Sequence, residues 1–159
     1  GLLKRNKIKP TPEVLKAIFS LRQKIFKRYF KRFIFKGAYE LLVDLKAGGF
    51  LLGLVSGSPL DEIKRILPAR LFKLFTSVVA GNQVKNGKPH PEPYLKAARL
   101  LKVTPGVCLV IENAPFGITS AKQAGMPCIA VSTSLPKQYL TAADLVVESL
   151  GQIPRLIPL

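Results

Sequence analysis

The sequence predicts an α/β protein in which a parallel sheet is covered by helices on both faces, giving three layers. From about residue 50 onwards, short apolar runs of strand length alternate with amphipathic runs of helical length. A strand with one solvent-exposed face alternates polar and apolar residues. These runs lack that alternation, so both faces of each strand are expected to be covered. With 159 residues, 48% of them hydrophobic, the chain is long enough to bury a core of ordinary domain size.

Helices are predicted for the N-terminal part of the chain. Over residues 12–33, Thr11 can cap the first turn and Pro12 stands at the first helical position. One stripe of this helix is apolar: Val14, Leu15, Ile18, Leu21, Ile25 and Phe26. A shorter helix is expected over residues 1–6, and another over residues 37–48, where a pair of glycines ends it.

The remaining elements follow in alternation. Strands are predicted over residues 51–55, 77–80, 107–111, 128–131 and 145–147, and helices over about 60–67, 92–101, 116–124 and 137–142. Crossovers between parallel strands are right-handed, and a site in such a sheet lies at the carboxyl ends of the strands. A boundary near residue 34 separates a basic helical piece from the α/β core.

The charge is strongly positive and unevenly distributed. The net charge is +16, and residues 1–36 hold twelve Lys and Arg against the single acid Glu13, a net of +11. The other residues hold thirteen Lys and Arg against eight acids, a net of +5. A basic face attracts nucleic acid and other polyanions. The segment has no motif of a nucleic-acid-reading module, so a solvated helix surface is the favoured interpretation and nucleic acid is not expected as a partner.

Two further classes of protein, membrane proteins and secreted proteins, are disfavoured. No apolar run is long enough to span a bilayer, so no membrane association is expected, and the first residues lack the pattern of a signal peptide. Cys108 and Cys128 lie in strand-like runs, where buried free thiols are expected. A reducing, cytoplasmic setting follows from this expectation.

Polar residues follow the first predicted strand, in the order Ser56, Gly57, Ser58. Gly57 removes bulk where a ligand could approach the backbone. Ser58, followed by Pro59 and Asp61, is expected to cap the next helix. Hydroxyls and free N–H groups at a helix N-terminus form a cradle for anions such as phosphate. Capping alone explains Ser58 but leaves Ser56 unexplained.

Two further clusters of polar residues are placed to join Ser56 at the same edge of the sheet. Lys88 stands in a proline-rich loop that fixes its reach, and a positioned ammonium suits a phosphate oxygen. His90 has no partner at metal-ligand spacing and is assigned to the loop. Glu112 and Asn113 follow an apolar run and offer the hard oxygen ligands that Mg²⁺ prefers. The alternative is that Glu112 is a buried acid paired with Lys88 or with a helix N-terminus.

These stretches resemble three motifs of the haloacid dehalogenase-like hydrolase superfamily, in its β-phosphoglucomutase/phosphoglycolate phosphatase branch. The matching stretches are LVSGS (54–58), GKPHPEPY (87–94), IENAPFGI (111–118), AGMPCIAV (124–131) and ADLVVE (143–148). The resemblance implies a Rossmann-like core over residues 34–159 and part of a helical cap over residues 1–33. It also implies that Ser56 and Lys88 are catalytic and bind the transferred phosphoryl group, with Gly57 and Ser58 in the phosphate cradle. Glu112 and Asn113 would then place Mg²⁺, although Asn113 replaces the commoner Asp and weakens the expectation of tight binding.

The resemblance has one gap. The family uses an Asp-x-Asp motif at the end of the central strand, and none occurs in this sequence, whose aspartates are Asp44, Asp61 and Asp144. The absent strand would lie between the strands that end at Ser56 and Ile111. Because adjacent strands lie about 4.8 Å apart, its omission would leave a gap of roughly 10 Å.

Three functional hypotheses follow. The first is a piece of a Mg²⁺-dependent phosphatase or phosphomutase that acts on a small phosphorylated metabolite and is inactive alone, because it lacks the nucleophilic aspartate. The second is a non-catalytic protein that binds phosphate or a polyanion through its basic N-terminal face. The third is one half of a split enzyme, whose nucleophile strand comes from another segment or chain.

Overall fold

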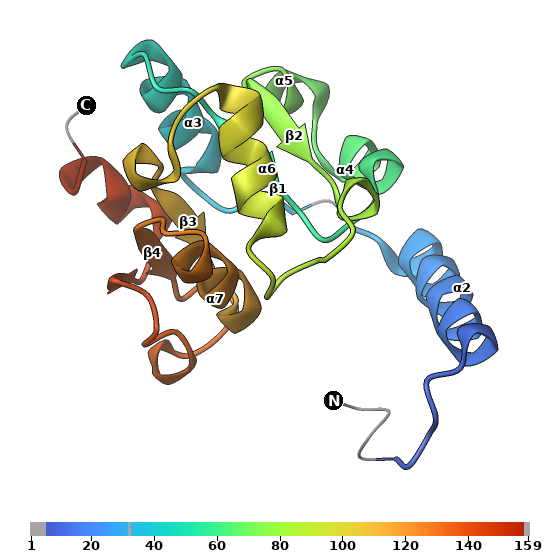
Figure 1. Ribbon diagram of the computed structural model, residues 1–159. Coiled ribbons are helices and arrows are strands. Elements are labelled where there is room, and N and C mark those ends of the chain that lie inside the picture. Colours follow the sequence, from blue (N-terminus) through green and yellow to red (C-terminus); the bar gives the residue numbers. More distant parts are fainter. Residues whose placement is uncertain (1–5, 32, 158–159) are drawn as a thin grey trace. The chain divides into compact units, whose positions relative to one another are not determined.

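The computed structural model describes residues 6–31 and 33–157, except the side chain of Lys27 (Figure 1). The chain divides into two compact units, an N-terminal unit of Gly1–Phe33 and a C-terminal unit of Ile34–Leu159. The sequence analysis expects the same two parts, residues 1–33 and 34–159.

The N-terminal unit contains helix α2, Pro12–Tyr29. As predicted, Thr11 is the N-cap, its Oγ1 accepting a hydrogen bond from the Val14 N–H at 3.4 Å. The prediction that this helix reaches residue 33 is wrong, because Phe30 turns to extended backbone and ends the helix. The helix expected over residues 1–6 lies outside the described residues apart from Asn6, which is in a turn.

The C-terminal unit contains all five predicted strands. They are β1 (Gly53–Val55), β2 (Ser77–Val79), β3 (Val110–Glu112), β4 (Cys128–Val131) and β5 (Leu145–Val147), and every pairing is parallel. The third strand begins later than predicted. Val107 instead ends the 3-10 turn η2, Pro105–Val107, and its side chain is 75% exposed.

The helices of this unit are α3 (Ala38–Ala47), α4 (Leu60–Ile66), α5 (Ala69–Phe72), α6 (Glu92–Leu101) and α7 (Pro115–Gln123). The 3-10 turns η1 (Gly81–Gln83), η3 (Lys137–Tyr139) and η4 (Leu150–Arg155) complete it. The helix expected over residues 137–142 is wrong: the Leu140 N–H bonds the Lys137 carbonyl and the Ala143 N–H bonds the Leu140 carbonyl. These two tight turns bury the Leu140 side chain completely. No helix in the described ranges is long and apolar enough to cross a bilayer.

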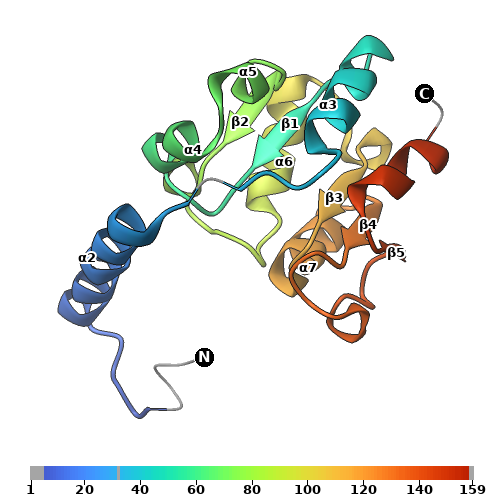
Figure 2. The same ribbon diagram turned by 180° about the vertical axis from the view of Figure 1, so that it is seen from behind.

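The core forms one cluster on each face of the strands, which gives the predicted three layers. Strand β4 shows how: Cys128 and Ala130 pack into the cluster under α6 and α7, whereas Ile129 and Val131 pack into the cluster under α3 and η4. In Figure 1, α6 and α7 lie in front of the strands, and in Figure 2, seen from behind, α3 lies in front. A strand covered on both faces has no polar side, which explains its continuous apolar sequence.

The strands form two sheets. Strand β1 pairs with β2, with Gly53 opposite Ser77, and β3, β4 and β5 form the second sheet, with Val110 opposite Cys128. Within the described part of the chain, no strand pairing joins β1 to β3. Figure 2 shows these two strands as the facing members of the two sheets.

Candidate active site

Ser56 lies directly after β1, where the strand approaches the next helix. Its N–H donates to the Val79 carbonyl at 2.9 Å, which extends the pairing with β2 by one residue. Its Oγ accepts a hydrogen bond from the Ser58 N–H at 3.1 Å. The half-buried hydroxyl is therefore held at the carboxyl end of the strand, as the sequence predicts.

Ser58 does not cap the following helix, so this prediction is wrong. Helix α4 begins at Leu60 with Pro59 as its N-cap, and no side chain of the cap residue bonds the first turn. Instead, Asn82 Oδ1 accepts a hydrogen bond from the Leu60 N–H at 3.2 Å. The cap thus comes from a turn 22 residues further along the chain, and local sequence contains no signal of it.

The two loops at this end approach each other at glycines. A Cβ built on Gly81 would lie 2.1 Å from the Gly57 carbonyl oxygen, and the Gly81 N–H donates to the Ser58 carbonyl at 2.9 Å. A Cβ on Gly57 would meet nothing within 4 Å. The packing therefore requires a glycine at position 81, which the sequence analysis did not identify, and leaves open space above Gly57.

Lys88 connects the ends of the two sheets. Its ammonium donates to the Val55 carbonyl of β1 at 3.3 Å and forms an ion pair with Glu112 of β3. The ammonium also lies 4.8 Å from the centre of the Tyr94 ring, and the side chain is only 19% exposed. The lysine is thus fixed in position, as predicted. The carbonyl that its ammonium bonds belongs to Val55, the residue directly before Ser56.

Glu112 is the most fully hydrogen-bonded side chain of this cluster. Oε1 accepts from Lys88 and, at 2.8 Å, from the Tyr94 hydroxyl. Oε2 accepts from the N–H groups of Asn113 at 2.8 Å and Ala114 at 3.1 Å, at the start of α7. The alternative interpretation of Glu112, a buried acid paired with Lys88 and with a helix N-terminus, is therefore confirmed in both its parts.

The electrostatics of Glu112 reflect this environment. Burial alone would raise the pKa of its carboxyl. Burial is the largest single effect, but the charge of Lys88 together with hydrogen bonds from Lys88, the Asn113 N–H and Tyr94 outweighs it, so the pKa lies below its ordinary value. The group is therefore an anion at neutral pH.

Tyr94 was missed as a member of the site. Its hydroxyl is the fourth donor to Glu112, and burial, followed by the negative charge of Glu112, raises the pKa of Tyr94. A tyrosine on the apolar stripe of a helix is indistinguishable in sequence from an ordinary core residue. Gly117, which lies in the matching stretch at residues 111–118, also shapes the site. A Cβ there would lie 2.0 Å from Glu112 Cδ, so the glycine makes room for the carboxylate.

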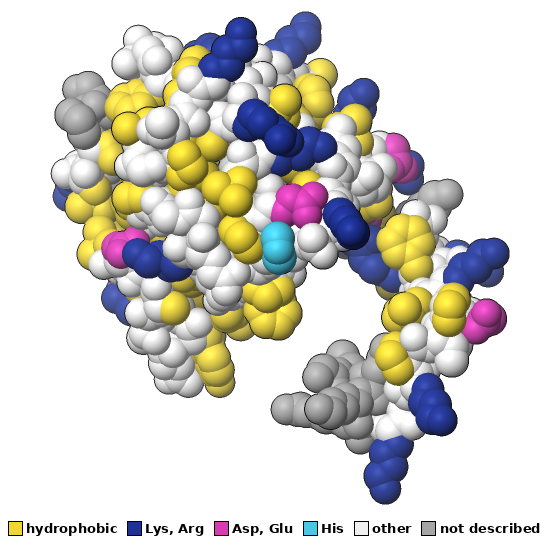
Figure 3. Space-filling model, viewed as in Figure 1, with side chains coloured by type: hydrophobic (Ala, Val, Ile, Leu, Met, Phe, Trp, Pro, Cys, Tyr) yellow, Lys and Arg dark blue, Asp and Glu magenta, His cyan; other side chains and the backbone are white. Residues whose placement is uncertain are grey.

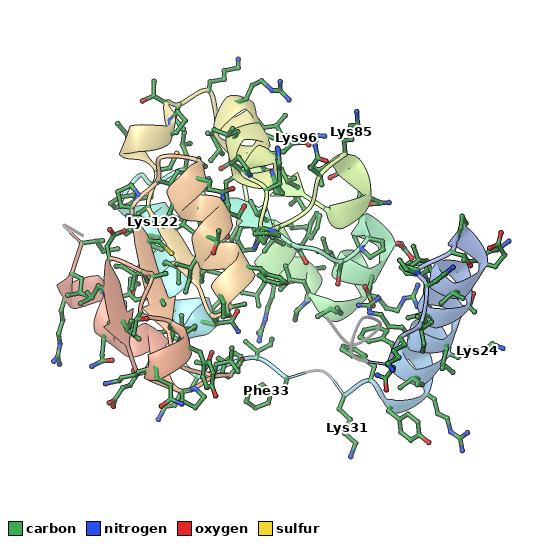
Figure 4. All side chains as sticks on the ribbon, turned by 60° about the horizontal axis from the view of Figure 1, so that its bottom comes forward. Lys24, Lys31, Phe33, Lys85, Lys96 and Lys122 are labelled. Atoms are coloured by element: carbon green, nitrogen blue, oxygen red, sulfur yellow. The ribbon has the colours of Figure 1, made fainter. Side chains whose placement is uncertain are left out.

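The loop that carries Lys88 is held by its own polar residues. Glu92 accepts hydrogen bonds from the Lys85 N–H at 2.8 Å and the Asn86 N–H at 2.9 Å, and these bonds lower the pKa of Glu92. His90 accepts at Nδ1 from the Glu92 N–H, and its carbonyl accepts from Ser120 Oγ at 2.7 Å. His90 thus belongs to the loop, as expected. Figure 4 labels Lys85 and Lys96 at this corner of the unit.

Glu112 and Asn113 by themselves do not make a Mg²⁺ site. Both Glu112 oxygens already accept hydrogen bonds, one of them from a cation, and the Asn113 amide donates to Ser134 Oγ at 3.0 Å. In the ranges that the structure describes, no three His, Cys, Asp or Glu residues gather where they could hold a metal. Mg²⁺ prefers a near-octahedral set of oxygens that includes one or two free carboxylates. The donors present do not fit this requirement.

Two curated relatives are phosphatases. Hexitol phosphatase A of Escherichia coli (strain K12) is 44% identical to this chain over 117 residues, which cover 74% of this chain and 54% of that protein. Phosphoglycolate phosphatase of Salmonella paratyphi A is 34% identical over 117 residues, 69% of this chain and 46% of its own length. The chain therefore spans about half the length of the curated relatives it matches.

A solved structure agrees with these relatives. The crystal structure of β-phosphoglucomutase from Clostridium difficile superposes with a TM-score of 0.66 at 32% identity, covering 76% of this chain and 52% of that one. The sequence model of the family described as haloacid dehalogenase-like hydrolase matches residues 3–131. Together with the parallel strands and the cluster at their carboxyl ends, this match means that the chain belongs to the haloacid dehalogenase-like hydrolase family.

Proposed function

We propose that the chain contributes part of a phosphoryl-transfer site that acts on a small phosphorylated metabolite, as a phosphatase or phosphomutase. The observation that supports this most is the fixed ammonium of Lys88, held between the Val55 carbonyl and Glu112 beside Ser56. A cation held in place at the ends of parallel strands can neutralise phosphate charge without first losing side-chain freedom. The phosphatase relatives support the same class of reaction.

Each residue of the proposed site has a separate role. Lys88 would bind a phosphate oxygen as a point charge. The Ser56 hydroxyl, which accepts from the Ser58 N–H, keeps its own hydrogen to donate to another phosphate oxygen. Gly57 and Ser58 would form the rest of the cradle, and the open space above Gly57 would admit the phosphate. Glu112 would hold Lys88 in place.

The nucleophile is proposed to come from outside the described residues. Asp61 lies on α4 and pairs with Arg65 at 3.5 Å, while Asp144 accepts from the Cys128 N–H at 2.7 Å and pairs with Lys122. Asp44 lies on α3. Further carboxylates would also be needed to complete a Mg²⁺ site with Glu112 and Asn113. We therefore expect residues 1–159 alone to have no phosphatase activity.

Two proposals concern the setting of the site. Residues 1–33 would form part of a helical cap, and their Lys and Arg side chains belong to a solvated surface; Lys24 and Lys31 are labelled on this unit in Figure 4. A cytoplasmic location would suit the two free thiols. Burial, followed by the charges of Glu112 and Asp144, raises the pKa of Cys128 to about 11 and keeps it a thiol.

The experiment measures phosphate binding and turnover separately. Backbone NMR spectra of the chain are recorded with increasing inorganic phosphate, for the natural sequence, Lys88→Met and the loop control Lys85→Met. We expect shifts at Ser56 and Gly57 that persist in Lys85→Met and disappear in Lys88→Met. Equal shifts in both variants would refute the site. Hydrolysis of p-nitrophenyl phosphate that Lys88→Met abolishes would refute the expected inactivity.

A further inference from the structure

Tyr94 connects the hydrophobic core of the C-terminal unit to the cluster around Lys88. The residue is only 7% exposed and belongs to the core cluster that also contains Ile118 and Cys128. Its N–H donates to the Pro91 carbonyl at 3.1 Å, in the first turn of α6. Because a close-packed core fixes the torsions of an aromatic side chain, the position of the Tyr94 hydroxyl is fixed as well.

Lys88, by contrast, lies on a loop and has a long, flexible side chain, so its contacts must hold the ammonium in place. The ammonium donates to the Val55 carbonyl at 3.3 Å and to Glu112 Oε1. It also lies over the ring of Tyr94, 4.8 Å from the ring centre. An ammonium has three N–H groups. The two acceptors within the described part of the chain therefore leave one N–H for a further acceptor.

The Tyr94 hydroxyl limits how Glu112 can hold that ammonium. A carboxylate offers about four positions for hydrogen-bond donors, two on each oxygen. On Glu112 these positions are filled by Lys88 and the Tyr94 hydroxyl on Oε1, and by the N–H groups of Asn113 and Ala114 on Oε2. Since the hydroxyl takes the second position on Oε1, Lys88 bonds this carboxylate through one N–H.

Loss of the hydroxyl would change this balance. With one donor fewer, the Glu112 carboxylate would become a stronger acceptor for Lys88, because a hydrogen bond to a charged group is strong in a partly buried site. The ammonium would then be drawn toward Glu112 and away from the Val55 carbonyl, which directly precedes Ser56. The ring of Tyr94 contributes separately, since the face of an aromatic ring attracts a cation.

We propose that Tyr94 is a positioning residue for phosphate binding: its hydroxyl shares Glu112 with Lys88 and its ring supports the ammonium, so that one N–H stays available to the phosphate. The inference rests on the proposed function, since it concerns the same site, and it adds a residue that itself makes no phosphate contact. Because Tyr94 acts through Lys88, its replacement should weaken phosphate binding although every phosphate-binding group is still present.

The first measurement follows the nitrogen NMR signal of the Lys88 ammonium without phosphate. Tyr94→Phe removes the hydroxyl and keeps the ring in the core, Tyr94→Leu removes both, and Ile118→Val is the control that loosens the same core cluster. We expect the signal to shift in Tyr94→Phe, to shift further in Tyr94→Leu and to stay unchanged in Ile118→Val. An unchanged signal in both Tyr94 variants would overturn the inference. So would an equal shift in Ile118→Val, because general loosening of the core would then explain it.

The second measurement is the dissociation constant of inorganic phosphate, taken from the NMR shifts of Ser56 and Gly57 in the same four proteins. We expect Tyr94→Phe to bind phosphate about threefold to tenfold more weakly than the natural chain, and Ile118→Val to bind it equally well. If Tyr94→Phe binds phosphate as tightly as the natural chain, the inference fails and the proposed function stands. If the natural chain binds no phosphate, the proposed function fails and the role of Tyr94 in phosphate binding fails with it.

Discussion

Lys88 and Glu112 form an ion pair between a loop and the third strand, and the same ammonium bonds the Val55 carbonyl of the first strand. The lysine therefore bridges two sheets that no strand pairing joins in the described ranges. Both side chains are largely buried, with 19% of Lys88 and 8% of Glu112 exposed. Removing one partner would leave the other charge poorly solvated, so the pair offers sharp tests.

Replacing Glu112 with Gln should destabilise the fold at pH 7 by about 2 kcal/mol, because the buried ammonium loses its counter-charge. The measurement is urea unfolding. The matched control is Glu148→Gln, which removes a surface pair with Lys137 that is mostly exposed. We expect no measurable change in the control, since exposed pairs contribute little. A loss in the control as large as that in Glu112→Gln would contradict the prediction.

The same substitution predicts a pH dependence. The pKa of Glu112 is lower in the folded chain than its ordinary value of 4.5. Its charge therefore stabilises the fold above the unfolded pKa, and this contribution is lost as pH falls through the folded pKa. The difference in unfolding free energy between the natural chain and Glu112→Gln should be full near pH 7 and shrink as pH falls below that ordinary value of 4.5. A constant difference down to pH 2.5 would refute this assignment.

Tyr94→Phe should raise the pKa of Glu112, since the carboxylate loses a hydrogen-bond donor while the ring keeps its place beside Lys88. The expected loss of stability is about 1 kcal/mol. Carbon-detected NMR titration of the Glu112 carboxyl measures the pKa, and urea unfolding measures the stability. Tyr139→Phe, on an exposed tyrosine, is the control and should change neither quantity.

Gly117→Ala should destabilise the chain although alanine favours helix by about 1 kcal/mol. The new Cβ would lie 2.0 Å from Glu112 Cδ and displace the carboxylate from the start of α7. In a Glu112→Ala background this clash is absent, so the same Gly117→Ala change should become neutral or stabilising. The double-mutant cycle is measured by urea unfolding, and an unchanged sign in the second background would exclude the clash as the cause.

Gly81→Ala and Gly57→Ala should separate packing from binding. The alanine at 81 would place its Cβ 2.1 Å from the Gly57 carbonyl oxygen, so we expect a loss of about 1–3 kcal/mol. The alanine at 57 meets nothing within 4 Å and should leave stability unchanged. If phosphate approaches there, Gly57→Ala should weaken the phosphate-induced NMR shifts. Undiminished shifts would remove Gly57 from the proposed cradle.

The surface charge was readable from the sequence. Figure 3 shows Lys and Arg side chains scattered over the visible face and fewer acids, in keeping with the net charge of +16. Composition determines such a property directly. The likeness to phosphatases favours the enzyme hypothesis over a polyanion-binding protein, so the charge by itself does not set the function.

Local sequence pattern predicted the bounds of a strand best where one short apolar run lies between clear turn residues. Strands β4 and β5 have the predicted bounds, because each fills a short apolar run between clear turns. The start of β3 was misplaced, since apolarity alone cannot distinguish the exposed Val107 in a turn from the buried Val110 in a strand. The cap of α4 was misassigned because its acceptor, Asn82, is distant in sequence.

The sequence by itself determined the order of strands and helices, the parallel sheet and the polar residues at the strand ends, because periodicity and turn residues act over a few neighbouring positions. Only the tertiary structure decided that Tyr94 and Gly117 shape the surroundings of Glu112. It also decided that Lys88 bridges the two sheets and that a largely apolar cavity lies between them. These features depend on contacts between residues far apart in the chain, which form when the sheets and helices pack, and no local pattern encodes them.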